Sequence, residues 1–443
     1  MGTVAGFPFI EAQFGKDGQP VEAAVARGVV EFAQREQLTD LLVLSHGWNN
    51  DMADARDLYS RLLAQVRAVL DAGVVPAIAG RTLGVVGVFW PSKKFTDAEL
   101  IPGGAASLGD GLSEDDTIRD RLDGLKGMFD KPDAAALEAA KQLVGAIEDD
   151  PAARRKFVDL VRSVLPEPTD ERDDASGTFF HLDGDDIFRL LEAPGLGAPP
   201  ASSSGGAAGL QDAGGAAGLF DVLSGMKAAA QRLLNFVTYY QMKERAGRVG
   251  ATGVNPLLRE VRRQLPHLKV HLAGHSFGGR LVTATADGSP SDPALGVSSM
   301  TLLQAAFSHN GFAPQQDDTP EGFFRQVVVQ QKVAGPIVIT HTANDTAVGI
   351  AYPLASRLAR QQASGLGDEH DVYGGIGRNG AVHTPEAVRN GILLPLPGGS
   401  NPQRYALESG KIYNLRADAV IGNHSDICKR EVAYALLSAV AAT

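Results

Sequence analysis

Apolar runs of strand length stand out in the first 91 residues. Residues 40–48 (DLLVLSHGW) and 83–91 (LGVVGVFWP) are short, nearly continuous apolar stretches, as expected of strands buried on both faces of a sheet. Residues 7–14 (FPFIEAQF) alternate enough for a further strand, and 21–37 has the apolar spacing of a helix. This part of the chain therefore predicts strands joined by helices.

A similar pattern resumes near residue 254 and continues to the end of the chain. Strand-like runs alternate with segments of helical spacing, which is typical of a parallel sheet with crossover helices. We expect residues 1–91 and 251–443 to form one α/β domain, a mostly parallel central sheet flanked by helices. The runs of strand type occupy 269–276, 298–308, 335–345 and 411–417, and those of helical type occupy 255–265, 277–286, 348–362 and 426–440.

The intervening residues 92–250 have a different character. Residues 134–165 and 226–247 have the spacing of helices, and no strand-like run of the same quality occurs here. Residues 193–220 are rich in Gly, Ala, Ser and Pro, a composition typical of a flexible segment. We expect a largely helical insert between the two parts of the sheet.

The stretch GHSFG, residues 274–278, lies where a strand-like run turns into a helix-compatible one. A serine at such a turn adopts a strained backbone that holds its hydroxyl clear of the sheet, and the flanking glycines let strand and helix pass closely. The helix N-terminus also offers N–H groups and positive potential to a developing oxyanion. The motif predicts Ser276 as a nucleophile; the alternative is an ordinary serine in a tight turn.

With this motif in its strand–helix context, the chain resembles the α/β-hydrolase superfamily over residues 1–91 and 251–443. The resemblance implies a nucleophile, an acid and a histidine in that chain order, each in a loop after a strand. It also implies that the insert 92–250 acts as a cap over the site. Four apolar positions in the insert either face an acyl chain or merely pack: Leu233, Phe236, Val237 and Tyr240.

A serine hydroxyl needs a base to take its proton and a carboxylate to orient that base. The resemblance places the acid just after a strand. The stretch 335–345 fits, because it is a strand-like run followed by Asp345. The alternative role for Asp345 is to cap a helix starting near Thr346. The other candidate acids are Asn344, Asp317 and Asp318.

Chain order then requires the base to follow Asp345, which leaves His370, His383 and His424. His370 and His383 lie in a glycine-rich stretch that reads as a loop. Only His424 follows a strand-like run and precedes a final helix, so we expect His424 to be the general base.

The resemblance also predicts a loop after an early strand that donates an N–H to the oxyanion. His46-Gly47-Trp48 follows the apolar run at 40–45, which makes the N–H of Trp48 one expected donor and that of Phe277 the other. Gly47 would let the backbone approach the substrate closely. Five residues form the predicted set of substrate contacts: His46, Gly47, His275, Trp90 and His309. The alternative for His309 is an ordinary polar residue of a loop. For Trp90, core packing is an equally good interpretation.

Composition narrows the function class. The chain has 443 residues and a net charge of −11, which disfavours nucleic acid or an anionic membrane as a partner.

No run approaches the ~20 apolar residues of a transmembrane helix, so we expect no integral membrane segment. The single cysteine, Cys428, and the lack of a recognisable signal peptide favour a cytoplasmic location. No zinc spacing or dinucleotide motif occurs, and the acidic stretch 181–186 lacks the ligand pattern of a calcium loop, so no metal or cofactor is expected.

These observations predict a serine hydrolase that cleaves a carboxylic ester of a small molecule or acyl chain through an acyl-enzyme. An amidase, a peptidase or an acyltransferase would use the same residues. A non-catalytic binding protein of this fold is the rival from another class, and such proteins typically lose a triad member. Composition and spacing leave the oligomeric state undefined.

Overall fold

The computed structural model describes residues 2–92, 113–167, 176–192, 225–316, 320–345, 374–398 and 403–443. The chain divides into two compact units. One comprises Met1–Ser92, Arg245–Val348 and Gly375–Thr443, and the other comprises Lys93–Glu244 and Gly349–Gly374. The expected flexible segment 193–220 and the expected helix 348–362 lie outside the described residues.

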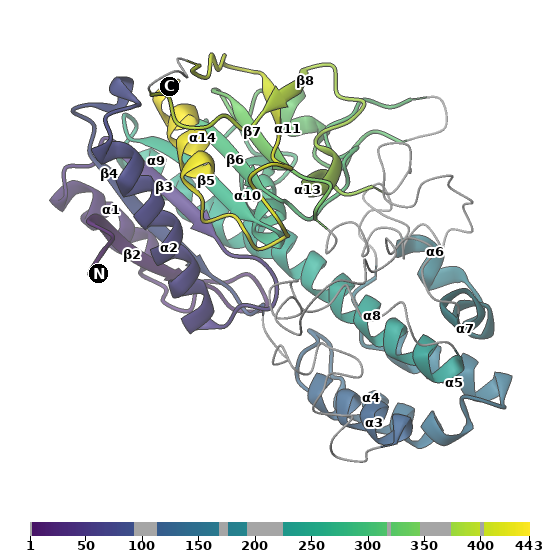
Figure 1. Cartoon of the computed structure of the whole chain (residues 1–443). Coiled ribbons are helices and arrows are strands. Elements are labelled where there is room, and N and C mark those ends of the chain that lie inside the picture. The colour runs from purple at the N-terminus through teal and green to yellow at the C-terminus, as the bar shows by residue number, and fades with distance from the viewer. Residues whose placement is uncertain are drawn as a thin grey trace. The chain divides into compact units, whose positions relative to one another are not determined.

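The first unit is built on a nine-stranded sheet with the order β1-β2-β4-β3-β5-β6-β7-β9-β8 (Figure 1). Only the pairing of β1 with β2 is antiparallel, and the remaining neighbours pair in parallel. The predicted α/β class with a mostly parallel sheet is therefore confirmed. The strands are β1 (Gly2–Val4), β2 (Phe7–Gln13), β3 (Asp40–Ser45), β4 (Leu83–Phe89), β5 (Lys269–His275), β6 (Ser299–Leu303), β7 (Ile337–His341), β8 (Ala387–Ile392) and β9 (Ile412–Arg416).

Helices flank this sheet. They are α1 (Val25–Arg35), α2 (Met52–Asp71), α9 (Asn255–Gln264), α10 (Phe277–Asp287), α11 (Arg325–Val329), α13 (Ile376–Asn379) and α14 (Arg430–Ala441), with the 3₁₀ helix η1 (Pro76–Ile78) and the π-helix η3 (Val249–Val254). Helix α2 starts at a capping box in which the Asp51 side chain accepts from the Asp54 N–H and Asp54 accepts from the Asp51 N–H.

Helices cover both faces of the sheet, and this explains why its central strands are apolar at nearly every position. Helices α2 and α14 pack against each other (Figure 1). Leu44, Leu303 and Val338 belong to the same buried cluster as residues of these helices. Because successive strand side chains point to opposite faces, Leu41 and Val43 face the other way. On that side α10 packs along β3, β5 and β6. All six residues of β3 are accordingly buried.

The described residues of the second unit are helical and include no strand. The helices are α3 (Glu114–Leu125), α4 (Ala134–Leu143), α5 (Pro151–Ser163), α6 (Ser176–His181), α7 (Gly184–Glu192) and most of α8 (Met226–Arg248), with the turn η2 (Val144–Ala146). A buried ion pair between Arg154 and Asp185 joins α5 to α7. The ring of Phe236 packs on Phe179, with centroids 4.9 Å apart, so this position of α8 contributes to the unit's own core. Leu233, Val237 and Tyr240 are buried as well.

The parallel arrangement brings several loops to one edge of the sheet. Strands β3, β5, β7 and β9 run in the same direction, so their carboxyl ends lie at the same edge. The crevice beyond the carboxyl ends of parallel strands is where open α/β sheets bind ligands. Across the described residues, no helix combines the length and apolarity needed to cross a bilayer.

Candidate active site

Ser276 occupies the turn between β5 and α10. Its backbone has φ 57° and ψ −126°, a conformation that residues with a side chain rarely adopt. Strand β6 and the loop after it hold the turn in place, because the Ser276 N–H donates to the Leu303 carbonyl at 3.1 Å and the Ser276 carbonyl accepts from the Ala306 N–H at 3.0 Å. Strained backbone of this kind persists only where its surroundings enforce it, and it concentrates at functional sites.

Two glycines make this turn sterically possible. A Cβ at position 274 would collide with the carbonyl of Gly278, and a Cβ at position 278 would collide with the carbonyl of Ser45. The strand and the helix therefore approach each other, and β3, more closely than side chains allow. This is the reason expected from the sequence for both glycines of the GHSFG motif.

The predicted acid and base lie side by side. The Nδ1–H of His424 donates to Oδ2 of Asp345 at 2.8 Å, although 79 positions separate the two residues. Asp345 follows β7 and His424 follows β9, and these two strands are neighbours in the sheet. The carboxylate is fully buried and the histidine side chain is 14% exposed. The bond fixes the ring with Nδ1 towards the acid, which leaves Nε2 to accept a proton.

The loop that carries Asp345 is held by its own polar residues. Oδ1 of Asp418 accepts from the Thr342 hydroxyl and from the Ala343 N–H, both at 2.9 Å. The Asn344 side chain donates to the carbonyl of Ile421 at 2.9 Å, which ties the loop after β7 to the loop after β9. Asn344 is therefore a brace between the two loops. The two other candidate acids, Asp317 and Asp318, lie outside the described residues.

The alternative bases do not share this geometry. His383 is exposed, and its Nδ1 lies 2.9 Å from the amide oxygen of Asn310. His370 lies outside the described residues, as does the helix start near Thr346 that Asp345 was expected to cap in the alternative interpretation.

Gly47 brings the loop after β3 against the candidate nucleophile. A Cβ added at Gly47 would lie 2.6 Å from Cβ and 3.1 Å from Oγ of Ser276. The next residue, Trp48, places its ring near that of Phe277, with centroids 6.2 Å apart. Phe277 is the first residue of α10, so its N–H is at the helix N-terminus, where partial positive charge gathers. The two expected oxyanion donors thus belong to segments that meet at Ser276.

His46 supports the loop after β3 through hydrogen bonds. Its Nδ1–H donates to the Gly47 carbonyl at 2.9 Å, and its Nε2 accepts from the Trp90 N–H at 3.3 Å. The Trp90 ring stacks on the imidazole at 5.6 Å between centroids, and its indole N–H donates to the His46 carbonyl. Complete burial lowers the pKa of His46 to about 4, so the ring is neutral at pH 7. Both residues are buried, and we interpret them as supports of the loop.

Tyr59 is a support that sequence patterns did not single out. Its hydroxyl accepts the N–H of His46 at 2.9 Å and donates to the Val88 carbonyl at 2.5 Å. It thereby joins the ends of β3 and β4 from helix α2. No local motif marks it, since its partners are brought to it only by the fold.

His309 is fully buried in the loop after β6. Its Nδ1 accepts from the side-chain amide of Asn379 at 3.0 Å. The contact joins this loop to α13, so His309 braces the loop against that helix. The predicted role of His309 in lining a substrate pocket gains no support from this contact.

A hydrogen-bonded cluster of Ser, His and Asp side chains lies at the opposite edge of the sheet. Nε2 of His271 is 2.9 Å from Oδ1 of Asp40, and Nδ1 is 2.8 Å from Oγ of Ser299. All three residues are at most 1% exposed. Burial would raise the pKa of Asp40, but hydrogen bonds from Arg81, His271 and Thr39 outweigh it and hold that pKa well below its usual range. This cluster has no access for a substrate and joins the amino ends of three strands.

Among the described residues, no group of three or more His, Cys, Asp or Glu side chains has an arrangement that would hold a metal ion. A comparison of the chain with known protein families, curated proteins and solved structures finds no match. The functional assignment therefore rests on the residues and their geometry.

Proposed function

We propose that the protein is a serine hydrolase of the α/β-hydrolase type that cleaves a carboxylic ester. The observation that carries the proposal is a strained serine at a strand-to-helix turn in the same sheet that pairs His424 with Asp345. Nucleophile, acid and base follow β5, β7 and β9 in that chain order, which is the order expected of this superfamily.

In the first half of the reaction, Nε2 of His424 takes the proton of the Ser276 hydroxyl as Oγ attacks the ester carbonyl. The carbonyl π electrons move onto oxygen, and a tetrahedral oxyanion forms. Asp345 stabilises the resulting imidazolium and holds the ring in the productive tautomer. The C–O bond to the alcohol then breaks, and His424 delivers its proton to the departing alkoxide, which leaves an acyl-enzyme on Ser276.

The N–H groups of Trp48 and Phe277 are the proposed donors to the oxyanion. Preorganised donors of this kind are worth roughly 3–4 kcal/mol each in known acyl-transfer enzymes. The contact of Gly47 with Ser276 supports this role, because only a residue without Cβ lets the donor loop come so close. The buried His46–Trp90 stack would keep the loop from relaxing away from the oxyanion.

In the second half, His424 removes a proton from water, and the hydroxide oxygen attacks the acyl carbon. The tetrahedral intermediate collapses, the acid leaves, and Ser276 Oγ regains the proton from His424. An ester is the proposed substrate because its cleavage needs nothing beyond these groups. The chain enters the second unit directly after β4, and this connectivity supports a role for that helical unit as the cap of the fold.

Turnover of a series of p-nitrophenyl esters of increasing acyl length tests the proposal. The wild-type protein should hydrolyse at least one member, and the Ser276→Ala variant should lose most of that rate, by a factor on the order of 10⁶ in kcat. Equal turnover by both proteins, or none by the wild type across the series, would contradict an esterase acting through Ser276.

A further inference from the structure

His275, the residue before the candidate nucleophile, contacts the candidate base. Its Nε2 lies 2.9 Å from the main-chain carbonyl oxygen of His424. The two imidazole rings are also in contact, with centroids 4.8 Å apart and planes tilted by 39°. His275 thus meets both the backbone and the ring of His424, and it does so from the turn that carries Ser276.

These contacts define the tautomer of His275. A carbonyl oxygen only accepts hydrogen bonds, so Nε2 carries the proton and donates it. Nδ1 is buried and has no hydrogen-bond partner among the described residues. Protonating Nδ1 would bury an unsatisfied donor, so the neutral ring is strongly favoured. Consistent with this, burial and the neighbouring His424 lower the pKa of His275 to about 3.

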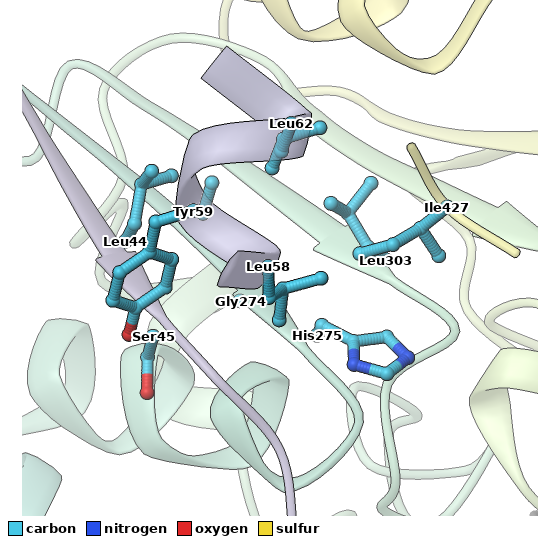
Figure 2. A pocket seen from close by; sticks show the side chains of 10 residues that line it. Leu44, Ser45, Leu58, Tyr59, Leu62, Gly274, His275, Leu303 and Ile427 are labelled. Carbon is cyan, nitrogen blue, oxygen red and sulfur yellow. The ribbon is translucent and has the colours of Figure 1, made fainter. Parts of the chain in front are cut away.

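His275 lines a small cavity together with apolar side chains (Figure 2). Its ring lies near Leu58, Leu303 and Ile427, and Ile427 belongs to the loop after β9. The cavity measures about 10 Å³, the size of about one water molecule. The ring therefore has little room to turn away from His424.

The loop around His424 is otherwise held by bonds to the loop after β7, through Asn344 and Asp345, and by short local bonds. The Gly422 N–H donates to Asp426, and the Ser425 N–H donates to the side chain of Asn423. Such bonds shape the loop but do not attach it to the strand that carries the nucleophile. The bond from His275 makes that attachment.

We propose that His275 is a positioning residue, which donates its Nε2–H to the His424 carbonyl and so fixes the base relative to Ser276. This role rests on the proposed function, in which His424 must reach the Ser276 hydroxyl. A neutral donor suits the place, because His424 becomes an imidazolium during the reaction and a cation beside it would oppose that charge. Lysine or arginine would also donate to the carbonyl, but either would add this repulsion.

Two variants of similar size separate donation from packing. His275→Gln keeps an N–H donor on a neutral side chain, and His275→Met fills the space without a donor. With a fluorophosphonate probe, His275→Met should react more slowly by roughly 10- to 100-fold, since a displacement of about 1 Å costs up to 100-fold. The Gln variant should recover most of that loss. Equal rates for wild type, Gln and Met variants would overturn the proposal.

A combination with His424→Ala tests whether His275 acts through the base. In that background His275→Met should cause no further loss of labelling rate, because the two residues act as a unit. An additive loss would indicate a merely structural effect and would contradict the positioning role.

A readout without turnover separates this inference from the proposed function. In the wild-type protein with 15N-labelled histidine, NMR should show His275 neutral with the proton on Nε2, and a low-field proton on His424 Nδ1. His275→Met should broaden or shift the His424 signal and His275→Gln should preserve it. If these changes appear while no variant reacts with the probe, the hydrolase proposal fails and the positioning contact stands. A His275 proton found on Nδ1 in the wild type would overturn the contact itself.

Discussion

The side chains of Asp345 and His424 meet at 2.8 Å in the loops after β7 and β9. The pairing of β7 with β9 and the bond of Asn344 between their loops bring the two residues together. The contact leaves Nε2 of His424 as the nitrogen that can accept a proton, which is the requirement for a general base acting on Ser276.

Asp345→Asn should leave the fold intact and reduce ester turnover on the order of 10³- to 10⁴-fold, because an amide no longer enforces the base's tautomer. The matched control is Asp418→Asn, which removes a charge from a brace of the same loop but keeps an oxygen acceptor for Thr342 and Ala343. Steady-state kinetics should show a loss below about 10-fold for the control. Similar losses in both variants would mean that loop geometry, not the acid, is responsible.

Gly47→Ala should weaken catalysis without unfolding the protein. The new methyl group would lie 2.6 Å from Cβ of Ser276, so the donor loop must move away from the oxyanion position. We expect kcat to fall by about 10²- to 10³-fold, the effect of losing one oxyanion donor. Gly28→Ala is the control, because a Cβ there meets only Ile10 at 3.9 Å. A Gly47→Ala variant as active as Gly28→Ala would remove the loop from the mechanism.

Ser276→Gly should make the protein more stable while abolishing its activity. At φ 57° a side chain strains the backbone and glycine does not. The strain is worth about 1–3 kcal/mol, partly offset by the greater flexibility of glycine in the unfolded chain. Urea unfolding should therefore give a free energy of unfolding about 1 kcal/mol above wild type. A less stable glycine variant would show that the turn is not strained.

Stability should decrease as the solution becomes acidic. Burial lowers the pKa of His46 to about 4 and that of His275 to about 3, from 6.5. In the unfolded chain these rings take up protons first, so their contribution is complete above pH 6.5 and is lost progressively as the pH falls towards 4 and 3. The free energy of unfolding should change by up to about 1.4 kcal/mol per pH unit per group.

Urea unfolding at several pH values between 7.5 and 4.5 checks this dependence. The His275→Gln variant should show a shallower fall, since one of the buried histidines no longer titrates. A free energy of unfolding that rises on acidification, or a variant with the same slope as wild type, would contradict the assignment of neutral buried rings.

The strand-to-helix turn at Ser276 could be predicted from sequence because its signals are local. An apolar strand, two glycines and a helix-compatible segment are contiguous around Ser276, and the structure places them as β5, the turn and α10. The acid and base were predicted from chain order and from the apolar runs before them. The structure brings Asp345 and His424 into contact, and their roles as acid and base stay predictions.

Other features escaped prediction because their causes are not local. Strand β8 (AVRNGI) is polar, contains Asn-Gly and is largely exposed, so it lacks the apolar run that marks the buried strands. The contacts of Tyr59 and His275 depend on which residues the sheet brings near them. Asp40, His271 and Ser299 also form a hydrogen-bonded Ser–His–Asp cluster, but they are buried. Residue types and distances alone therefore do not define a catalytic site, because a substrate must also reach it.

Covalent labelling with a fluorophosphonate, followed by peptide mapping, tests the central claim most directly. The wild-type protein should carry one adduct on Ser276, and Ser276→Ala should carry none. Ser299→Ala is the matched control, because Ser299 also lies beside a histidine, Nδ1 of His271 at 2.8 Å, but is 1% exposed. It should react at the wild-type rate. An adduct mapped to another serine, or undiminished labelling of Ser276→Ala, would contradict the account.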